Sequence, residues 1–308
     1  MYPATDSVVF ERRCAIRVLI TGATGFIGTA IRAALTDRGD TVVALRRGPK
    51  GSGPRWDPDA GTIDADALEG VDAVIHLAGA SILPPWTKAK RERILESRRK
   101  GTSLISRSVA ASRTPVLISA SGMDYYGERG DDLLTETEPK GSGFMSDVVE
   151  VWESSAAAAR EAGSRVVHLR TSLVLDSSGG SLPLIMLPFR FFVGGPIGDG
   201  RQWWSWITLT DQVRAILHVL DHSEVSGPVN LSSPNPVSNR VFMRALGSAM
   251  GRPSWFPTPE FLVKSVLGSD AAGSLVLESK RVVPDVLIRT GFVFSYPEIG
   301  AALDHAVH

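Results

Sequence analysis

Three glycines stand at intervals of three residues near the start of the chain, at Gly22, Gly25 and Gly28. Glycine permits a sharp turn and lets the backbone approach a pyrophosphate, and the free N–H groups at a helix start bind the anion. An apolar run precedes this turn and a helical pattern follows it, which is the order of a dinucleotide-binding site. The residues expected to contact the cofactor here are Gly22, Thr24, Gly25, Phe26, Ile27 and Gly28.

Two arginines, Arg46 and Arg47, directly follow the second apolar run of the chain. A site that prefers NAD(H) places an Asp or Glu on the ribose hydroxyls at this point. Guanidinium groups suit a 2′-phosphate instead, because they bind it through charge-assisted and often bidentate hydrogen bonds. We therefore expect NADP(H) as the cofactor, with two solvated loop arginines as the alternative.

The order of apolar runs and helical patterns indicates the fold that positions these residues. Strands are expected at Ile16 to Ile20, Thr41 to Leu45, Ala73 to Leu77, Val116 to Ser119, Arg165 to Thr171 and Val229 to Leu231. Helical patterns cover Phe26 to Arg38, Thr87 to about Lys100, Thr102 to Ser112, Asp147 to Ala162, Asp211 to Asp221 and Asn239 to Met250. Such alternation is typical of the α/β class, with a doubly wound parallel sheet of the Rossmann type.

The same patterns divide the chain into three parts. Residues 1–16 are expected to be an N-terminal extension, and residues 17–175 the NADP-binding Rossmann domain. Residues 176–308 are expected to form a substrate-side region and a smaller C-terminal α+β cap, and the chain could interleave between the two. Glycines and aromatic residues gather from Ser177 to Trp206, which suits the lining of a pocket. An aromatic core under a long loop is the alternative.

Composition excludes several classes of protein. The chain has 33 basic and 33 acidic residues, so no global field draws it to nucleic acid or an anionic membrane. A single cysteine, Cys14, excludes an internal disulfide framework and fits a reducing cytoplasm. The first sixteen residues hold no uninterrupted apolar segment of secretory or membrane-spanning length. We expect a cytoplasmic protein whose partner is a small molecule, and a homodimer is compatible with the sequence.

The histidines do not predict a metal site. Only His218 and His222 have the spacing of a metal-ligand pair, and no third ligand is in view.

Several further motifs carry a resemblance to a known family. They are His76-Leu77-Ala78-Gly79, Ser97-Arg98 with Gly101-Thr102, Ser119-Ala120-Ser121 with Tyr125-Tyr126-Gly127, Trp152-Glu153, Gly194 to Gly198, Gly200-Arg201-Gln202, Asn230-Leu231 and Ser279 to Pro284. From Arg17 to Val307 the chain resembles the extended short-chain dehydrogenase/reductase superfamily. Within it, the chain is similar to an atypical NAD(P)-dependent epimerase/dehydratase branch with a short C-terminal domain of unknown function, sometimes labelled sugar-nucleotide epimerase or SulA-type.

The resemblance implies roles for residues outside the glycine turn. It implies that Leu77, Ala78 and Gly79 run beneath the cofactor and that Arg98 reaches the cofactor phosphates. The loop residues Arg201 and Gln202 are candidate substrate contacts.

The superfamily mechanism uses a Tyr, a Lys four residues later and a Ser or Thr that hydrogen-bonds the reacting oxygen. A phenol with a pKa near ~10 needs a neighbouring cation to act near neutrality. Ser121 stands where the hydroxyl belongs, but the expected Tyr and Lys are absent. The positions expected for them hold Phe144 or Met145 and Val148 or Val149.

Two tyrosines near Ser121 could replace the missing phenol, namely Tyr125 and Tyr126, although Tyr126 is also a structural residue of the motif it belongs to. A second departure from the branch is Thr208, where a His is usual. Asp211 is expected to cap the helix that follows.

The interpretation that best accounts for these residues is an NADP(H)-dependent oxidoreductase or epimerase-like enzyme that acts on a small polar or nucleotide-linked substrate. Ser121 would orient the reacting oxygen, and Tyr125 or Tyr126 would donate the proton. The alternative, which the missing Tyr–Lys pair permits, is a regulatory or sensor protein that binds NADP(H) without chemistry.

Overall fold

The computed structural model describes residues 14–48 and 53–308, so the expected extension over residues 1–16 lies outside the described residues except for its last three. The strands are β1 (Arg17–Thr21), β2 (Thr41–Leu45), β3 (Trp56–Asp57), β4 (Thr62–Ile63), β5 (Ala73–His76), β6 (Val116–Gly122), β7 (Leu133–Leu134), β8 (Arg165–Thr171), β9 (Leu173–Leu175), β10 (Trp203–Trp204), β11 (Trp206–Thr208), β12 (Gly227–Leu231), β13 (Val237–Ser238) and β14 (Arg281–Val282). The helices are α1 (Phe26–Asp37), α2 (Lys88–Ser112), α3 (Phe144–Ser154), α4 (Ala157–Glu161), α5 (Leu182–Arg190), α6 (Leu209–Asp221), α7 (Asn239–Ala249), α8 (Glu260–Leu267), α9 (Ser269–Ala272), α10 (Asp285–Arg289) and α11 (Ile299–Val307), with a 3-10 turn η1 (Met123–Tyr126) and a π-helical turn η2 (Gly273–Leu277).

The central sheet is parallel and has the strand order β12-β8-β6-β5-β1-β2. The chain runs from β1 to β2 and then crosses to β5 on the other side of β1. This reversal creates a crevice at the carboxyl ends of β1 and β5, which is where such sheets bind their ligands. The expected Rossmann-type fold is confirmed.

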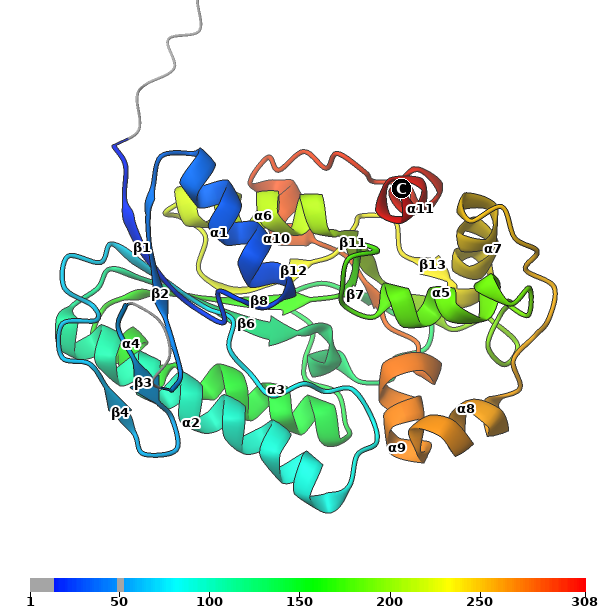
Figure 1. Ribbon diagram of the computed structural model, residues 1–308, viewed down its shortest axis with the longest axis horizontal. Helices are drawn as coiled ribbons and strands as arrows, with labels where there is room; N and C mark the ends of the chain where they lie inside the picture. The colour runs from blue at the N-terminus through cyan, green and yellow to red at the C-terminus, as the bar shows by residue number, and fades with distance from the viewer. Residues whose placement is uncertain (1–13, 49–52) are drawn as a thin grey trace, which may run out of the picture.

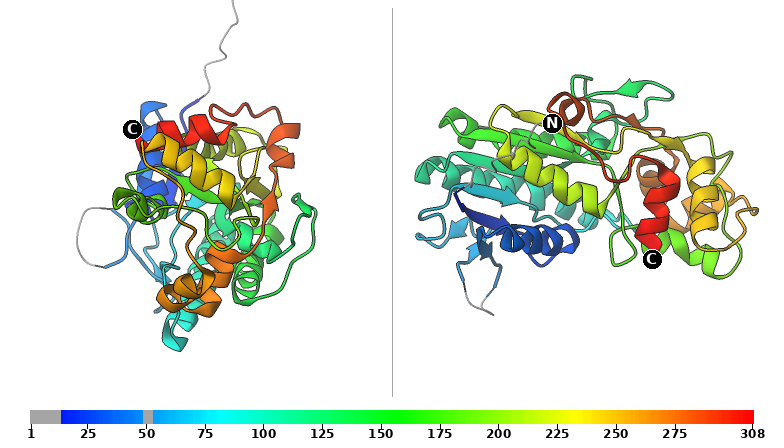
Figure 2. Two further views of the ribbon diagram at one scale, coloured as in Figure 1. Left: turned by 90° about the vertical axis from the view of Figure 1, so that its right-hand side faces the viewer. Right: turned by 90° about the horizontal axis from the view of Figure 1, so that it is seen from above.

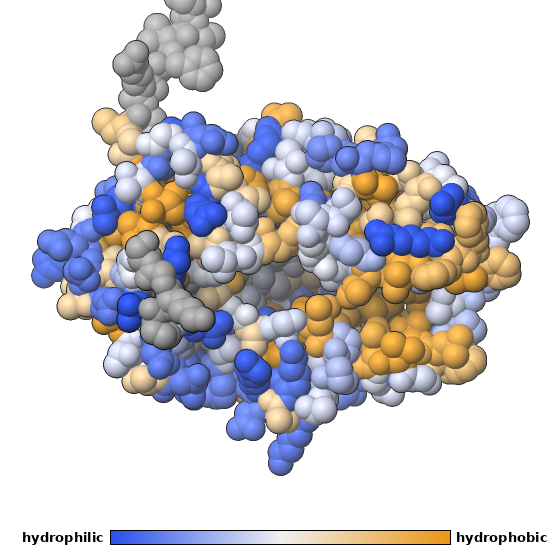
Figure 3. Space-filling model, in the orientation of Figure 1, coloured by the Kyte–Doolittle hydropathy of each residue, from blue (hydrophilic) through white to orange (hydrophobic). Residues whose placement is uncertain are grey.

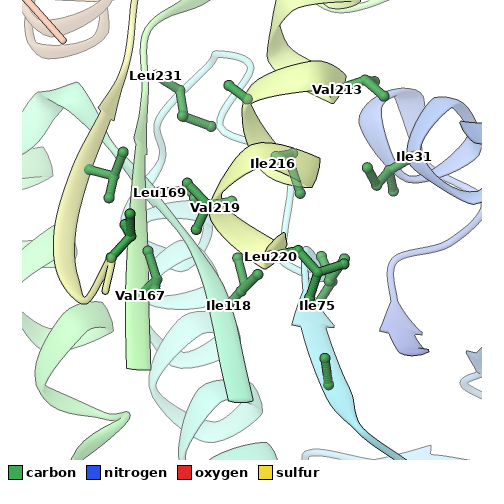
Figure 4. Packing of buried hydrophobic residues seen from close by; sticks show 14 of the residues in the cluster. Ile31, Ile75, Ile118, Val167, Leu169, Val213, Ile216, Val219, Leu220 and Leu231 are labelled. Atoms are coloured by element: carbon green, nitrogen blue, oxygen red, sulfur yellow. The ribbon is translucent and has the colours of Figure 1, made fainter. Parts of the chain in front are cut away.

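Helices cover both faces of the sheet (Figure 1), with α1 and α6 on one face and α2, α3 and α4 on the other. Ile216 and Val219 of α6 pack against the sheet residues Ile118 and Leu169 (Figure 4). All four side chains are fully buried, and each contributes about 1.5–3 kcal/mol through the apolar area it removes from water. This packing fixes α6 against β6 and β8.

Helix boundaries differ from the sequence pattern at three places. The two segments expected on either side of Gly101 form one continuous helix, α2, in which Gly101 packs at ordinary contact distance against the rings of Trp56 and His76. The helix expected from Asp147 to Ala162 is two helices, α3 and α4, separated after Ser154. The cap of α6 is the Thr208 hydroxyl, which accepts from the Asp211 N–H, so the expectation that Asp211 caps this helix was wrong.

The C-terminal part of the molecule, which includes α5, α7, α8, α9 and α11, packs around a second core at the carboxyl edge of the sheet (Figures 1 and 2). Phe189, Trp204 and Trp206 are buried in it, so the aromatic-core alternative holds for these three rather than a pocket lining. Helix α6 and strand β12 return to the sheet after residue 175.

Apolar side chains are also exposed on the C-terminal part, on the right of Figure 3, over α5 and α8. They include Leu184, Leu187, Phe191, Phe192, Trp255, Phe256, Phe261 and Val266. Among the described residues, no helix has the length and apolar character to cross a membrane.

Candidate cofactor and substrate site

The glycine turn between β1 and α1 has no space for side chains. Gly22 adopts a positive φ of 71°, which favours glycine, and a Cβ on Gly28 would lie 2.1 Å from the Gly22 carbonyl oxygen. The N-cap residue of α1 is Gly25, which supplies no side-chain hydrogen bond, and the first turn of the helix holds no acidic residue. The backbone N–H groups at the start of α1 are therefore available to an anion.

A cavity of about 220 Å³ opens on this turn. It is lined by Gly22, Gly25, Phe26, Ile27, Gly28, Leu77, Ala120, Leu169, Thr171 and Gln212. Six of the residues expected to bind the cofactor thus share one cavity, and Thr24 is exposed on the same turn. In Figure 3 the surface is hollowed near the centre of the face, where Figure 1 places the start of α1 and the end of β6.

A buried hydrogen-bond chain positions the backbone on the other side of the turn. The Thr21 hydroxyl contacts His76 Nδ1 at 2.7 Å and accepts from the N–H groups of Leu77 and Ala78 at 3.2 Å. His76 Nε2 lies 3.1 Å from the Thr102 hydroxyl. Burial lowers the pKa of His76 to about 4, so the imidazole is neutral near pH 7. The chain fixes Leu77 and Ala78 against Gly22, whose Cβ position is 3.0 Å from their backbone atoms.

The two arginines after β2 differ in their surroundings. Arg46 is half-buried, and its Nε is buried without a hydrogen-bond partner among the described residues. Arg47 is exposed. A buried guanidinium nitrogen that lacks an acceptor is compatible with a phosphate ligand at this point.

Arg98 lies beneath the loop that follows β5 rather than on its surface. The guanidinium is 3.6 Å from the Cβ position of Gly79 and donates hydrogen bonds to the carbonyls of Ala80 and Ile94 at 3.1 Å. It also stacks over the Trp152 ring at 4.6 Å. Burial lowers the pKa of Arg98 to about 10, which still leaves it charged near neutrality. These contacts support the Gly79 loop from below.

Ser121, at the end of β6, is engaged by an ion pair that the sequence did not reveal. Its Oγ donates to Glu153 Oε1 at 2.7 Å, and Glu153 accepts two hydrogen bonds from Arg170, at 2.8 and 2.9 Å. Burial alone would raise the pKa of Glu153, but the hydrogen bonds and charge of Arg170 outweigh it and hold that pKa below its ordinary value. Glu153 and Arg170 come from α3 and β8 and meet only in the fold.

The two tyrosines have different environments. Tyr126 is fully buried, donates to Asn230 Oδ1 at 2.7 Å and accepts from Arg170 at 3.1 Å. Burial raises the pKa of Tyr126 to about 12. Tyr125 is half-buried, and the Arg170 guanidinium lies 3.5 Å over its ring. Tyr125 is therefore the phenol of the pair that remains accessible.

Helix α3 carries no acid–base group where the superfamily has its Tyr and Lys. Met145 and Val149 stand one turn apart on this helix and are both buried. Gly122 Cα faces this region, because a Cβ there would be 3.7 Å from both Val149 Cγ2 and Asp124 Oδ2. Asp124 was not among the expected site residues, since nothing in its local sequence distinguishes it from a turn residue.

Gln212 was also missed, although it lines the cofactor cavity. Its amide nitrogen donates to the Thr171 hydroxyl at 3.3 Å, whereas its Oε1 is buried without a partner among the described residues. Only the packing of α6 on the sheet brings this side chain to the glycine turn.

The other expected contacts lie elsewhere. The Arg201 side chain is 88% exposed and pairs with Asp199 at 3.7 Å, while Gln202 donates to the Ile197 carbonyl at 3.2 Å. Neither lines the cavity at the glycine turn. The His218 and His222 rings stack 3.7 Å apart, and the described residues hold no group of three metal-ligating side chains.

Comparison with known proteins agrees with this geometry. Residues 18–232 match the NAD dependent epimerase/dehydratase family, and residues 258–306 match a domain of unknown function, DUF1731. An epimerase family protein of Mycobacterium leprae is 37% identical over 292 residues, which cover 94% of this chain and 95% of the relative.

Solved structures give the same result. The human epimerase family protein SDR39U1, crystallised with NADPH, is 34% identical and superposes with a TM-score of 0.87 over 94% of this chain and 99% of the human one. A nucleoside-diphosphate sugar epimerase of Corynebacterium glutamicum is also 34% identical, with a TM-score of 0.79 over 96% of this chain and 58% of that one. The chain therefore belongs to the NAD dependent epimerase/dehydratase family and carries the DUF1731 domain at its C-terminal end.

Proposed function

We propose that the protein is an NADP(H)-dependent oxidoreductase or epimerase-like enzyme acting on a small polar or nucleotide-linked substrate. The observation that carries the cofactor choice is the buried, unpartnered Nε of Arg46 beside the exposed Arg47, at the end of the strand that follows the glycine turn. The NADPH bound to the human relative supports the same choice. When bound, the cofactor would supply or accept a hydride.

Each part of the site has a proposed task. The start of α1 and the backbone from Leu77 to Gly79 hold the pyrophosphate side of the cofactor, and Arg46 and Arg47 hold its 2′-phosphate. Arg98 supports the Gly79 loop. The substrate side lies at the carboxyl edge of the sheet, next to the C-terminal part (Figure 1).

Of the hydroxyls expected to act on the substrate, we assign Tyr125 to hydrogen-bond the reacting oxygen, since it is the accessible one. Ser121 and Tyr126 already donate their protons to Glu153 and Asn230. In this proposal they hold the Glu153–Arg170 pair in place beneath Tyr125.

Binding measurements test the cofactor assignment. The wild type should bind NADPH more tightly than NADH, and Arg46→Ala should weaken NADPH binding by roughly 10- to 100-fold, because it removes charge-assisted hydrogen bonds to a phosphate. NADH binding should change little. Arg107→Ala, an exposed arginine on α2, is the matched control and should behave as the wild type. Equal affinity of the wild type for both nucleotides would contradict the assignment.

The missing Tyr–Lys pair favours a second candidate, a protein that binds NADP(H) as a sensor. Incubation with NADPH and panels of carbonyl compounds and sugar nucleotides distinguishes the two by the absorbance of the reduced nicotinamide. Oxidation by a member of the panel, weakened in Tyr125→Phe, supports the enzyme. Tight NADPH binding without oxidation by any member supports the sensor.

A further inference from the structure

One charged side chain at the end of β6 has no task in the proposed function. Asp124 stands in η1, and its Oδ1 accepts a hydrogen bond from Lys280 Nζ at 3.0 Å. Its side chain is 14% exposed, so the carboxylate is neither free in solvent nor sealed in the core. The other oxygen, Oδ2, lies 3.7 Å from the Cβ position of Gly122.

Asp124 lies just beyond the carboxyl end of β6, four residues after Ala120 of the cofactor cavity. Ala120 lines that cavity, and Gly122 ends the same strand two residues further on, where its Cα faces Val149 of α3. Gly122 has no side chain of its own, and the space next to it is bordered by Asp124 Oδ2 and Val149 Cγ2. The carboxylate thus lies beside the α3 position at which the superfamily's lysine is missing.

Lys280 fixes this carboxylate from the C-terminal part of the chain. It is buried, and its three N–H groups reach Asp124, Glu278 at 2.7 Å and the Ser274 carbonyl at 2.6 Å. Burial alone would lower the pKa of Lys280, but the two carboxylates outweigh it and raise that pKa, so the ammonium stays charged. A purely structural ion pair would explain Lys280 and Glu278, but it would not require a second, partly exposed carboxylate at the carboxyl end of the sheet, beside the α3 position of the missing lysine.

We propose that Asp124, positioned by Lys280, is the acid–base group of this site, an inference that rests on the proposed function. In the oxidising direction Asp124 Oδ2 takes the proton of a substrate hydroxyl, and the electrons of the O–H bond form the second bond of the carbonyl. The cofactor, when bound, would accept the hydride that leaves the same carbon, so atoms and charge balance. In the reducing direction Asp124 returns the proton. The substrate class is an alcohol or its carbonyl counterpart.

The charge of the nicotinamide ring provides a test that needs no substrate. The ring carries a positive charge in NADP⁺ and none in NADPH, so a neighbouring carboxylate favours the oxidised form. Asp124→Asn keeps an acceptor for Lys280 and should weaken NADP⁺ binding relative to NADPH by on the order of tenfold. Lys280→Met removes a positive charge, so it should strengthen NADP⁺ binding relative to NADPH binding. Titration calorimetry with the two nucleotides gives both constants.

The control is Asp72→Asn, the same substitution at the opposite, amino-terminal edge of the sheet, where Asp72 accepts from the Arg17 N–H. Its affinity ratio should equal that of the wild type. If Asp124→Asn folds and its ratio of NADP⁺ to NADPH affinity is unchanged, the inference is overturned. If Lys280→Met does not fold, the result for Asp124→Asn decides the test by itself. If the wild type binds neither nucleotide, the proposed function fails first and the inference falls with it.

Turnover provides the second readout if the NADPH panel yields a substrate. Asp124→Asn should then lower kcat by about 100-fold or more with little change in KM, as expected for loss of a positioned proton acceptor. Unchanged kcat in this variant would count against the role even if the affinity ratio had shifted.

Discussion

Gly28 shows how a single residue controls the nucleotide turn. A methyl group on it would stand 2.1 Å from the Gly22 carbonyl oxygen, so the turn would have to open. We expect Gly28→Ala to weaken NADPH binding at least ~10-fold, because the backbone N–H groups at the start of α1 would no longer converge on the pyrophosphate. Gly300→Ala in α11 is the control, since a Cβ there meets nothing within 4 Å. Calorimetry on the two variants measures the difference.

His76 makes the stability of the fold depend on pH. The unfolded chain binds a proton on this imidazole below about pH 6.5, whereas the folded protein resists it down to about pH 4. The stability contributed by the neutral imidazole is therefore present above pH 6.5 and is lost as the pH falls toward 4, by about 3 kcal/mol.

The variant His76→Gln removes the titration and keeps a polar group between Thr21 and Thr102. Urea unfolding at pH 7 and pH 4 should show a smaller loss of unfolding free energy in the variant than in the wild type. An equal loss in both proteins would show that another group carries the effect.

The residues of the site fall into two kinds with respect to sequence. The glycine turn and Arg46 are recognisable from the sequence, because their proposed task depends on a few consecutive residues next to one strand, and their contacts with the cofactor stay predictions. Asp124 and Lys280 could not, because they lie 156 residues apart and only the fold joins them. The orientation of Ser121 toward Glu153 depends in the same way on a contact between distant elements.

Among the elements, α6 depends on its cap. The Thr208 hydroxyl accepts from the Asp211 N–H at 3.1 Å and closes the first turn of a helix that holds Gln212 against the cofactor cavity. Thr208→Ala should destabilise the protein by about 1–2 kcal/mol, and Thr208→Ser should recover most of the loss. Chemical denaturation of the three proteins compares these values. Equal stability of the Ala and Ser variants would contradict a capping role.

Element positions followed from the sequence where periodicity was strong, as for the strands of the parallel sheet. The boundaries that failed depend on tertiary packing. Gly101 suggested a break, but it packs in ordinary contact with the rings of Trp56 and His76, and α2 continues through it. Asp211 suggested a cap, but its carboxylate instead accepts the backbone N–H groups of Ser295 and Tyr296, far along the chain.

The whole molecule should unfold as one unit. β14 pairs with β7, and the buried Glu136 accepts from the N–H groups of Asn230 and Val286, so the C-terminal part and the sheet share their hydrogen bonds. Tryptophan fluorescence reports on both parts, because Trp56 and Trp152 are buried beside the sheet and Trp204 and Trp206 are buried in the second core, and far-ultraviolet circular dichroism reports on all elements. We expect their urea transitions to coincide. Two separate midpoints would show that the parts are independent.

The pairing of β7 with β14 also affects the order in which parts of the protein can fold during translation. Leu134 of β7 leaves the ribosome long before Val282, its partner, is translated. At roughly 5–20 residues per second, the β7 segment waits several seconds or more for that partner. Tyr126 and Leu134, which share a small core with Val282, stay incompletely covered for that time. The nucleotide turn can therefore form early in synthesis, whereas Lys280 reaches Asp124 only when translation is nearly finished.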